Sequence, residues 1–292
     1  MSAEGLVEVT RGALVESRHA GTLAVVDGAG RRVVAIGDVE RAIFPRSAVK
    51  LIQALPLVES GAADAFGLSV AELSVAGASH NGEPLHCETA LSMIRKAGLD
   101  ADALECGPQW PERPEDVAAL TLAGAKPTAL HNNCSGKHAG FLCLACRMGV
   151  DPEGYVEPDH PAQREVTAAL SSMTETPLTP EVRGVDGCSI PTYAVPLERV
   201  ARAYARMGTG DHLPPVRAAA ATRLRLAVAD APFLVAGTGR FCTEVMERFG
   251  PRAYVKIGAE GVYTAIFPDA GLGVTLKVDD GGTRASEALM AA

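Results

Sequence analysis

A serine and a lysine three residues apart are the first pair in this sequence whose types and spacing could do chemistry. Ser47 and Lys50 form the pattern Ser-x-x-Lys at the start of a predicted helix. Residues three apart on a helix share one face, so the hydroxyl and the amine could meet. A serine becomes a nucleophile when a base takes its proton, and burial or a second cation can make a lysine such a base. By itself the pattern favours a simpler interpretation, a helix-capping serine followed by a solvated lysine.

Two later patterns change that interpretation. A Ser-x-Asn pattern begins at Ser79, and a Lys-x-Gly pattern begins at Lys256 on a predicted late strand. In this order the three patterns are the active-site motifs of serine β-lactamases and penicillin-binding proteins. We therefore predict that Ser47 attacks a substrate and that Lys50 takes its proton. Ser79 would relay that proton towards the leaving group, and Lys256 would supply positive charge.

The densest polar cluster in the chain is the segment His131–Phe141, which precedes an apolar helix. Backbone N–H groups at such a helix start attract carboxylates, so small polar side chains here could bind a polar substrate. The alternative is an elaborate helix cap made by Asn132, Asn133 or Ser135. The residues alone leave both interpretations open.

Taken together, these segments closely resemble the asparaginase II family, the Rhizobium-type L-asparaginases. The segments that carry the resemblance are Ser47–Lys50, His131–Phe141, Val185–Pro191 and Lys256–Gly261. The resemblance runs from about residue 6 to residue 290. It implies a fold like that of serine β-lactamases and glutaminases, and hydrolysis of L-asparagine to L-aspartate and ammonia. It also implies a homodimer, and two serine–lysine pairs that fall on Ser47 with Lys50 and on Ser79 with Lys256.

The resemblance further implies a zinc ion near the active centre. Its ligands would be two cysteines and a lysine, which match Cys134, Lys137 and Cys188. From the residues alone the two cysteines would be packed thiols, and a lysine must lose its proton before it can bind a metal. We expect such a zinc ion to tune substrate binding rather than to perform the chemistry. The residues predicted to bind the substrate are Arg46, His80, Asn132, Asn133 and Asp186.

The elements that must position these residues fall into three parts. Four strands are predicted in the first forty residues, over 6–10, 13–18, 22–27 and 32–36. Helices follow over 48–60, 84–97, 114–123, 137–148, 161–173, 197–207 and 215–229. Short strands return over 233–236, 253–257, 262–267 and 273–278. This order predicts an α+β fold, with one antiparallel sheet built from about 1–45 and 230–292 and a helical region over about 46–229.

Composition supports one catalytic domain over 1–292. The chain has 292 residues and a net charge of −8, which argues against a nucleic-acid partner. No apolar stretch is long enough for a membrane helix, and the N-terminus lacks the pattern of a signal peptide, so we expect a cytoplasmic protein. Seven cysteines at scattered spacings are typical of free thiols in a reducing compartment.

Two alternatives remain open beside an L-asparaginase. One is a glutaminase or another small-amide hydrolase that uses the same residues. The other is a binding module with a β-lactamase-like fold that keeps the Ser-x-x-Lys geometry without turnover. Release of ammonia from asparagine and from glutamine, measured side by side, separates these possibilities.

Overall fold

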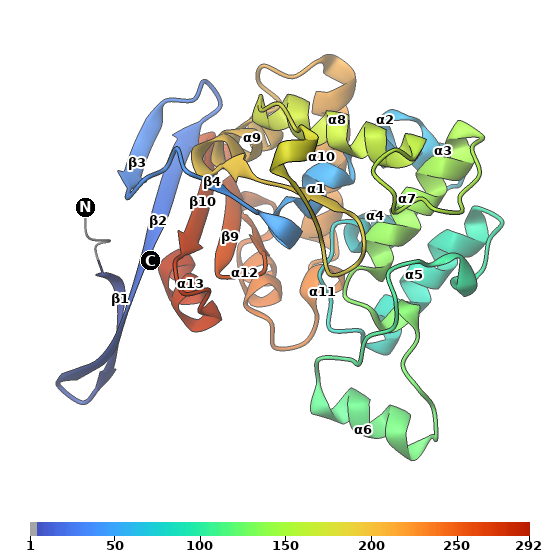
Figure 1. Ribbon diagram of the computed structural model, residues 1–292, viewed down its shortest axis with the longest axis horizontal. Coiled ribbons are helices and arrows are strands. Elements are labelled where there is room, and N and C mark those ends of the chain that lie inside the picture. Colours follow the sequence, from blue (N-terminus) through green and yellow to red (C-terminus); the bar gives the residue numbers. More distant parts are fainter. Residues whose placement is uncertain (1–4) are drawn as a thin grey trace.

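An antiparallel sheet joins the two ends of the chain in the computed structural model, which describes residues 5–292. Its strand order is β1-β2-β10-β9-β8, and β3 also pairs with β2. Every pairing is antiparallel (Figure 1). The predicted α+β class and the sheet from both chain ends are therefore confirmed. The strands are β1 (Gly5–Arg11), β2 (Leu14–Asp27), β3 (Arg32–Ile36), β8 (Tyr254–Ile257), β9 (Val262–Phe267) and β10 (Leu272–Val278).

Two of the predicted N-terminal strands form one long strand, β2. Its first part pairs with β1, and its second part pairs with β10 and β3. The expected break lies near Gly21, which instead pairs with Val278 of β10. A Cβ atom at Gly21 would lie 2.5 Å from the carbonyl oxygen of Lys277, so the glycine allows the two backbones to approach. Gly21, which suggested a turn in the sequence, is instead explained by the close packing of β2 against β10.

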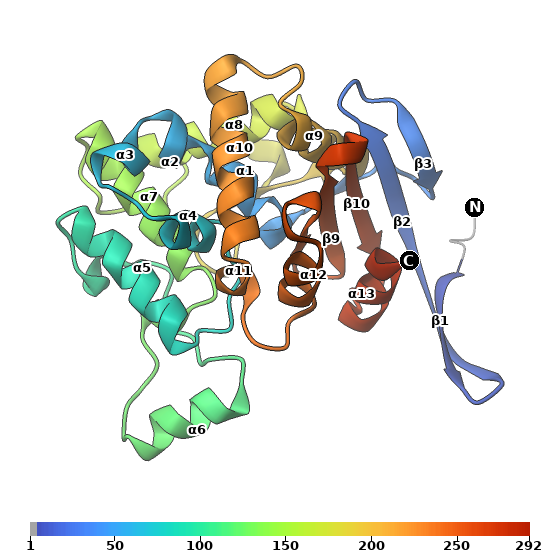
Figure 2. The same cartoon turned by 180° about the vertical axis from the view of Figure 1, so that it is seen from behind.

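The chain between the two groups of strands is mostly helical and forms a layer beside the sheet (Figures 1 and 2). A 3₁₀ turn over Arg46–Val49 opens it. Its helices are α1 (Lys50–Gln53), α2 (Leu55–Glu59), α3 (Ala62–Ala65), α4 (Val70–Ala76), α5 (Pro84–Lys96), α6 (Pro114–Leu122), α7 (Ser135–Met148), α8 (Pro161–Thr174), α9 (Leu197–Thr209), α10 (Pro215–Asp230), α11 (Phe233–Ala236) and α12 (Phe241–Phe249). Helix α13 (Thr283–Ala291) follows the last strand, and two small ribbons pair β4 (Ala42–Ile43) with β7 (Val195–Pro196) and β5 (Arg183–Val185) with β6 (Pro191–Tyr193).

One predicted strand is wrong, and the helical region is longer than expected. The segment 233–236 forms the short helix α11, and helices continue to Phe249 rather than ending near 229. A short buried apolar run cannot by itself distinguish a strand from a helical turn, and Pro232 directly before it suits a helix start. The predicted sheet boundary at residue 1 lies outside the described residues.

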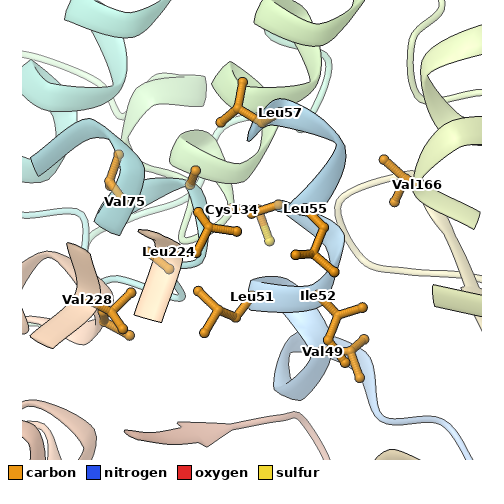
Figure 3. Packing of buried hydrophobic residues seen from close by; sticks show 14 of the residues in the cluster. Val49, Leu51, Ile52, Leu55, Leu57, Val75, Cys134, Val166, Leu224 and Val228 are labelled. Atoms are coloured by element: carbon orange, nitrogen blue, oxygen red, sulfur yellow. The ribbon is translucent and has the colours of Figure 1, made fainter. Parts of the chain in front are cut away.

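Helix α1 lies in the middle of the core. Figure 3 shows Leu51 and Ile52 of this helix among side chains from α2, α4, α8 and α10. Both side chains are fully buried, and the same core continues into the strands of the sheet. A polar residue at the start of α1 is therefore surrounded by protein. None of the helices in the described part of the chain has the length and apolar character needed to cross a membrane.

Candidate active site

The buried amine of Lys50 is the centre of the candidate active site. Lys50 is the first residue of α1, and its side chain has no exposed surface. Its Nζ lies 2.7 Å from the Ala78 carbonyl oxygen, 2.8 Å from Ser79 Oγ and 3.1 Å from Cys134 Sγ. Burial lowers the pKa of Lys50, although the nearby Cys134 thiol opposes this shift. This is the environment that a lysine base requires.

The hydrogen bonds pair the serines and lysines differently from the prediction. Lys50 contacts Ser79, and within residues 5–292 no hydrogen bond joins its amine to Ser47 Oγ. The amine instead reaches the Ala78 carbonyl, a buried acceptor that needs a donor. Lys256 donates to its neighbour Ile257 at 2.9 Å rather than to Ser79. Ser79 is thus hydrogen-bonded to Lys50 in this structure, and the pairing of Ser79 with Lys256 stays a prediction.

Ser47 lies on the 3₁₀ turn before α1 and is partly exposed. The preceding Arg46 has φ 51°, in the left-handed region that residues other than glycine rarely adopt. At Gly258, a Cβ atom would lie 2.5 Å from the Pro45 carbonyl oxygen. The end of β8 thus packs directly against the turn that carries Ser47. Strained backbone of this kind, which costs about 1–3 kcal/mol, is common at functional sites.

Lys256 brings a second buried cation to this region. It lies on β8, and its side chain is only 1% exposed. Burial lowers the pKa of Lys256 well below its ordinary value, and the charge of Lys50 lowers it further. A buried lysine whose ionisation is opposed by a neighbouring buried lysine is typical of a site where one of them must be neutral.

His80 supports the site from inside the protein instead of facing a ligand. Its side chain is fully buried, Nδ1 accepts a hydrogen bond from the Gly82 N–H at 3.1 Å, and Nε2 lies 3.0 Å from Ser135 Oγ. The ring therefore carries its proton on Nε2 and donates it to Ser135. Burial and the neighbouring His86 hold the pKa of His80 well below its ordinary value. Both ring nitrogens have partners within the protein, and substrate binding by His80 stays a prediction.

The two asparagines before Cys134 also have different environments. Asn132 Nδ2 donates to the carbonyl oxygens of Cys106 at 2.9 Å and Gly107 at 3.1 Å. Its Oδ1 accepts from the Cys134 N–H at 2.9 Å. This side chain braces the loop before α7. The residue at the N-cap of α7 is Cys134, whose side chain makes no capping hydrogen bond, so Asn132 is not the capping residue. The Asn133 side-chain oxygen lies 2.9 Å from Cys134 Sγ.

The three predicted zinc ligands lie together. Lys137 Nζ donates to Cys188 Sγ at 3.1 Å, and all three side chains, including Cys134, are buried. The Cys188 thiol and the two lysines hold the pKa of Cys134 well below its ordinary value, while the same contact and burial raise the pKa of Cys188. Residues 5–292 contain no cluster of three His, Cys, Asp or Glu side chains arranged for a metal. Two thiols and an amine suit the soft character of zinc, so the residues fit if Lys137 gives up its proton.

Arg46 and Asp186 form an ion pair at the edge of the site. Arg46 Nε lies 2.8 Å and Nη2 lies 2.6 Å from Asp186 Oδ1. Burial opposes ionisation of Asp186, but the charges of Lys137 and Arg46 hold its pKa below the ordinary value. The pair ties the turn before Ser47 to the loop that carries Cys188. It also places one positive and one negative group side by side where both remain partly accessible.

A cavity of about 590 Å³ opens beside Arg46. This volume is in the range of small-molecule binding sites. Its wall combines apolar and charged side chains from four segments, so the cavity can accept a polar ligand. The other lining residues are Arg41, Ala42, Ile43, Phe44, Gly184, Val185, Thr192, Glu260, Lys277 and Asp279.

Comparison with known proteins places the chain in a family. The family model described as L-asparaginase II matches residues 7–292, nearly the whole chain. The chain belongs to the L-asparaginase II family. No curated protein matches it. Membership in the L-asparaginase II family confirms the resemblance carried by the four segments of the sequence.

Solved structures overlap with this L-asparaginase II chain only loosely. A β-lactamase from Mycobacterium bovis is 12% identical, with 93% of this chain and 94% of that chain covered and a TM-score of 0.46. A simvastatin synthase mutant from Aspergillus terreus is 10% identical, with 92% and 90% covered and a TM-score of 0.46. Overlaps at this level carry no argument about the reaction.

The sequence reasoning missed a polar network beside Ser79. Glu83 is buried and accepts hydrogen bonds from Thr238 and Arg113, and Arg240 donates to Asn81 Oδ1 at 2.8 Å. The available signal was Asn81-Gly82-Glu83, in which the carboxylate comes two residues after the end of the Ser-x-Asn pattern. The second signal, Gly237-Thr238-Gly239-Arg240, is too short to indicate a nucleotide site and its packing role is visible only in the fold.

Proposed function

We propose that this chain hydrolyses the side-chain amide of L-asparagine to L-aspartate and ammonia through a serine acyl-enzyme. Family membership makes the chain an amide hydrolase. The observation that carries the proposed mechanism is the 2.8 Å contact between Lys50 Nζ and Ser79 Oγ inside the core. This distance is in the range that a nucleophile and its base require.

The hydrogen bonds around Lys50 are consistent with a base ready to accept a proton. A neutral amine has two N–H donors and one lone pair. The Ala78 carbonyl oxygen can only accept, so it takes one donor. In the structure Lys50 Nζ donates to Ser79 Oγ. In the proposed step a neutral Lys50 turns its lone pair to this oxygen and accepts the hydroxyl proton. A fully charged amine offers no lone pair for this step.

In the proposed reaction a serine oxygen forms a bond to the amide carbon while its proton moves to Lys50. The tetrahedral intermediate collapses, the C–N bond breaks, and Lys50 returns the proton so that ammonia leaves. Water then attacks the ester carbon and gives a proton to Lys50. The bond between that carbon and the serine oxygen breaks, Lys50 returns the proton to the serine oxygen, and L-aspartate leaves the free serine. The sequence assigns positive charge for the oxyanion to Lys256. The charge of Lys50 is one cause of the lowered pKa of Lys256, so Lys256 holds a proton most readily while Lys50 is neutral.

Two serines are candidates for the nucleophile. The sequence pattern favours Ser47, which is partly exposed and remains the prediction from the motif. The hydrogen bond favours Ser79, which alone of the two contacts the amine among residues 5–292. If Ser47 attacks, Ser79 carries its proton to Lys50. Lys50 therefore serves as base in both assignments, and the covalent intermediate distinguishes them.

The ion pair of Arg46 and Asp186 supports an amino acid as the substrate. Asparagine carries a carboxylate and an ammonium on the same carbon. A partly accessible guanidinium beside a carboxylate offers one partner to each. Zinc held by Cys134, Lys137 and Cys188 would fix the Asn132–Asn133 loop. With two thiolates and a neutral amine it would bring no net charge to the site, and it takes no part in the steps above.

Ammonia release from asparagine and from glutamine at equal concentrations tests the function. We expect asparagine to be preferred, because a pocket built for one chain length discriminates a single methylene by about 10- to 200-fold. Acid quenching during turnover, followed by peptide mass mapping, locates the aspartyl group on Ser47 or Ser79. A chain that binds asparagine in calorimetry without releasing ammonia is a binding module, and the proposal is then wrong.

A further inference from the structure

A buried carboxylate that the proposed reaction does not use lies four residues after Ser79. The side chain of Glu83 is enclosed, and its oxygens accept hydrogen bonds from the Thr238 N–H at 2.8 Å and the Thr238 hydroxyl at 2.7 Å. They also accept from Asn81 Nδ2 at 3.1 Å and from Arg113 Nη1 at 3.0 Å. Glu83 precedes helix α5, but these four bonds run to residues outside that helix. A carboxylate held so fully is a costly feature that needs a reason.

The partners of Glu83 belong to three separate segments. Asn81 lies on the turn that carries Ser79, Thr238 lies on the loop between α11 and α12, and Arg113 lies at the root of α6. Burial opposes ionisation of Glu83, but the hydrogen bonds from Thr238 and its other partners hold its pKa below the ordinary value. The carboxylate is therefore charged, and its bonds are the strong kind that ions make.

Backbone hydrogen bonds join the Ser79 turn to the end of α11, directly before that loop. The Ser79 N–H donates to the Val235 carbonyl at 2.9 Å, and the Asn81 N–H donates to the Ala236 carbonyl at 2.9 Å. Gly237 follows with φ 110°, and a Cβ atom there would collide with the Glu83 carboxylate and the Asn81 amide. The loop can thus fold over the carboxylate only because this residue is glycine.

We infer that Glu83 is a positioning residue for the Ser79–Lys50 pair. It clamps the Ser79 turn to the loop 237–240 and so holds Ser79 Oγ within hydrogen-bonding distance of the amine. This inference rests on the proposed function for its effect on the reaction, and on contacts in the fold for the clamp itself. Glu83 contacts neither the reacting serines nor Lys50 among the described residues.

The consequence for kinetics follows from geometry. A displacement of about 1 Å at a reacting group can cost about a hundredfold in rate. Loss of the clamp changes the distance between Ser79 and Lys50 but leaves the Arg46–Asp186 pair and the cavity in place. We therefore expect kcat to fall by about 10- to 100-fold while KM changes by less than about threefold.

Glu72 offers a matched control in the same protein. It is also a buried glutamate, and it accepts from the Ser69 N–H at 2.6 Å, from Ser92 Oγ at 2.8 Å and from Lys96 Nζ at 2.6 Å. Its partners lie directly before α4 and on α5, and none of these three belongs to the Ser79 turn or to the loop 237–240. The variants Glu83→Gln and Glu72→Gln each replace a buried, hydrogen-bonded carboxylate by an amide, so a merely structural effect should be similar in both.

The experiment compares both variants with the wild-type chain. Urea unfolding gives their stability, and steady-state ammonia release gives kcat and KM. Hydrogen exchange measured by mass spectrometry follows the peptides that cover 77–83 and 234–241. We expect comparable destabilisation in both variants, with the loss of kcat and the faster exchange of these two peptides only in Glu83→Gln. Should Glu83→Gln fail to fold, Thr238→Val removes one bond to the carboxylate and should give a smaller loss of kcat in the same direction.

Equal kinetics and equal exchange for Glu83→Gln and Glu72→Gln overturn the inference. An unchanged kcat in Thr238→Val overturns it as well when that variant must be used. If the wild-type chain releases no ammonia, the proposed function fails by itself. The hydrogen-exchange measurement still tests the clamp in that case, because it needs no turnover. Unchanged protection of the peptides 77–83 and 234–241 in Glu83→Gln counts against the inference, and lost protection of these peptides supports it.

Discussion

Replacing Lys50 by methionine tests the proposed chemistry most directly. The Lys50 side chain is fully buried, and methionine fills similar space without the amine. Loss of a general base lowers a rate by about 100- to 10,000-fold, so we expect Lys50→Met to lower kcat by about a thousandfold. The fold should survive, because the apolar contacts remain. The variant mainly loses the hydrogen-bond donor to the Ala78 carbonyl oxygen, which lowers its free energy of unfolding by about 1–3 kcal/mol.

Combining Lys50→Met with Ser79→Ala makes the prediction quantitative. The two groups lie 2.8 Å apart and act in one step, so their separate losses should not multiply. A thousandfold loss corresponds to about 4 kcal/mol of transition-state stabilisation. The double variant should be about as slow as either single variant, whereas independent roles would make it about a millionfold slower. The same cycle with Ser47→Ala shows which serine shares the step with Lys50.

The assay is ammonia release over time, with circular dichroism and urea unfolding for each variant. Lys96→Met is a suitable control, because Lys96 donates to Glu72 at 2.6 Å on the surface of the helical layer. It should keep wild-type kcat within about twofold. A Lys50→Met protein that is folded and retains more than a tenth of wild-type kcat would refute Lys50 as the base. Multiplying losses in both double variants would refute the shared proton transfer.

Three further predictions concern the edge of the site, the metal and pH. Arg46→Lys loses the forked bond to Asp186, so KM for asparagine should rise by about 10-fold or more with a smaller change in kcat in steady-state assays; an unchanged KM contradicts a binding role. Cys188→Ser should lower the zinc content found by elemental analysis and raise KM while kcat stays measurable, and a folded, metal-free protein without any kcat would show that zinc is catalytic. Burial lowers the pKa values of His80 and His86, so the unfolded chain binds more protons than the folded one below about pH 6.5. The free energy of unfolding therefore keeps its full value above that pH and decreases below it. Between pH 7.5 and 5.5 we expect a loss of up to about 1.4 kcal/mol per histidine in urea titrations, and an unchanged free energy of unfolding over this range contradicts the role of the two histidines.

The strands were predicted well from local patterns, and the errors have local causes. Strand β9 has the predicted bounds, and β10 begins one residue early. The prediction for segment 233–236 was wrong because four apolar residues, three of them buried, satisfy a strand and a helical turn equally. Its helical form matters to the site, since the carbonyls of Val235 and Ala236 receive the N–H groups of the Ser79 turn.

The composition of the site was easier to predict than its pairing. Helical spacing placed Lys50 beside Ser47, but the amine found its partners in a segment about thirty residues further along the chain. A buried acceptor in a distant segment has no signal in local spacing. For the same reason the sequence could indicate Asn132 as a polar residue of the site without showing that it braces the loop. The nucleophile, zinc, the homodimer and the cytoplasmic location stay predictions.

The position of helix α6 determines where this chain can accept insertions and deletions. It projects from the body in both views, and residues 114–122 include no buried side chain (Figures 1 and 2). The chain leaves the body beside Arg113 and returns near Asn132, both anchored by hydrogen bonds. Lengthening a surface excursion between anchored ends costs little free energy, about 0.6 kcal/mol for each doubling. The arm can thus be shortened, exchanged or opened to create new termini without disturbing Ser79 and Lys50, provided that its two anchors are kept.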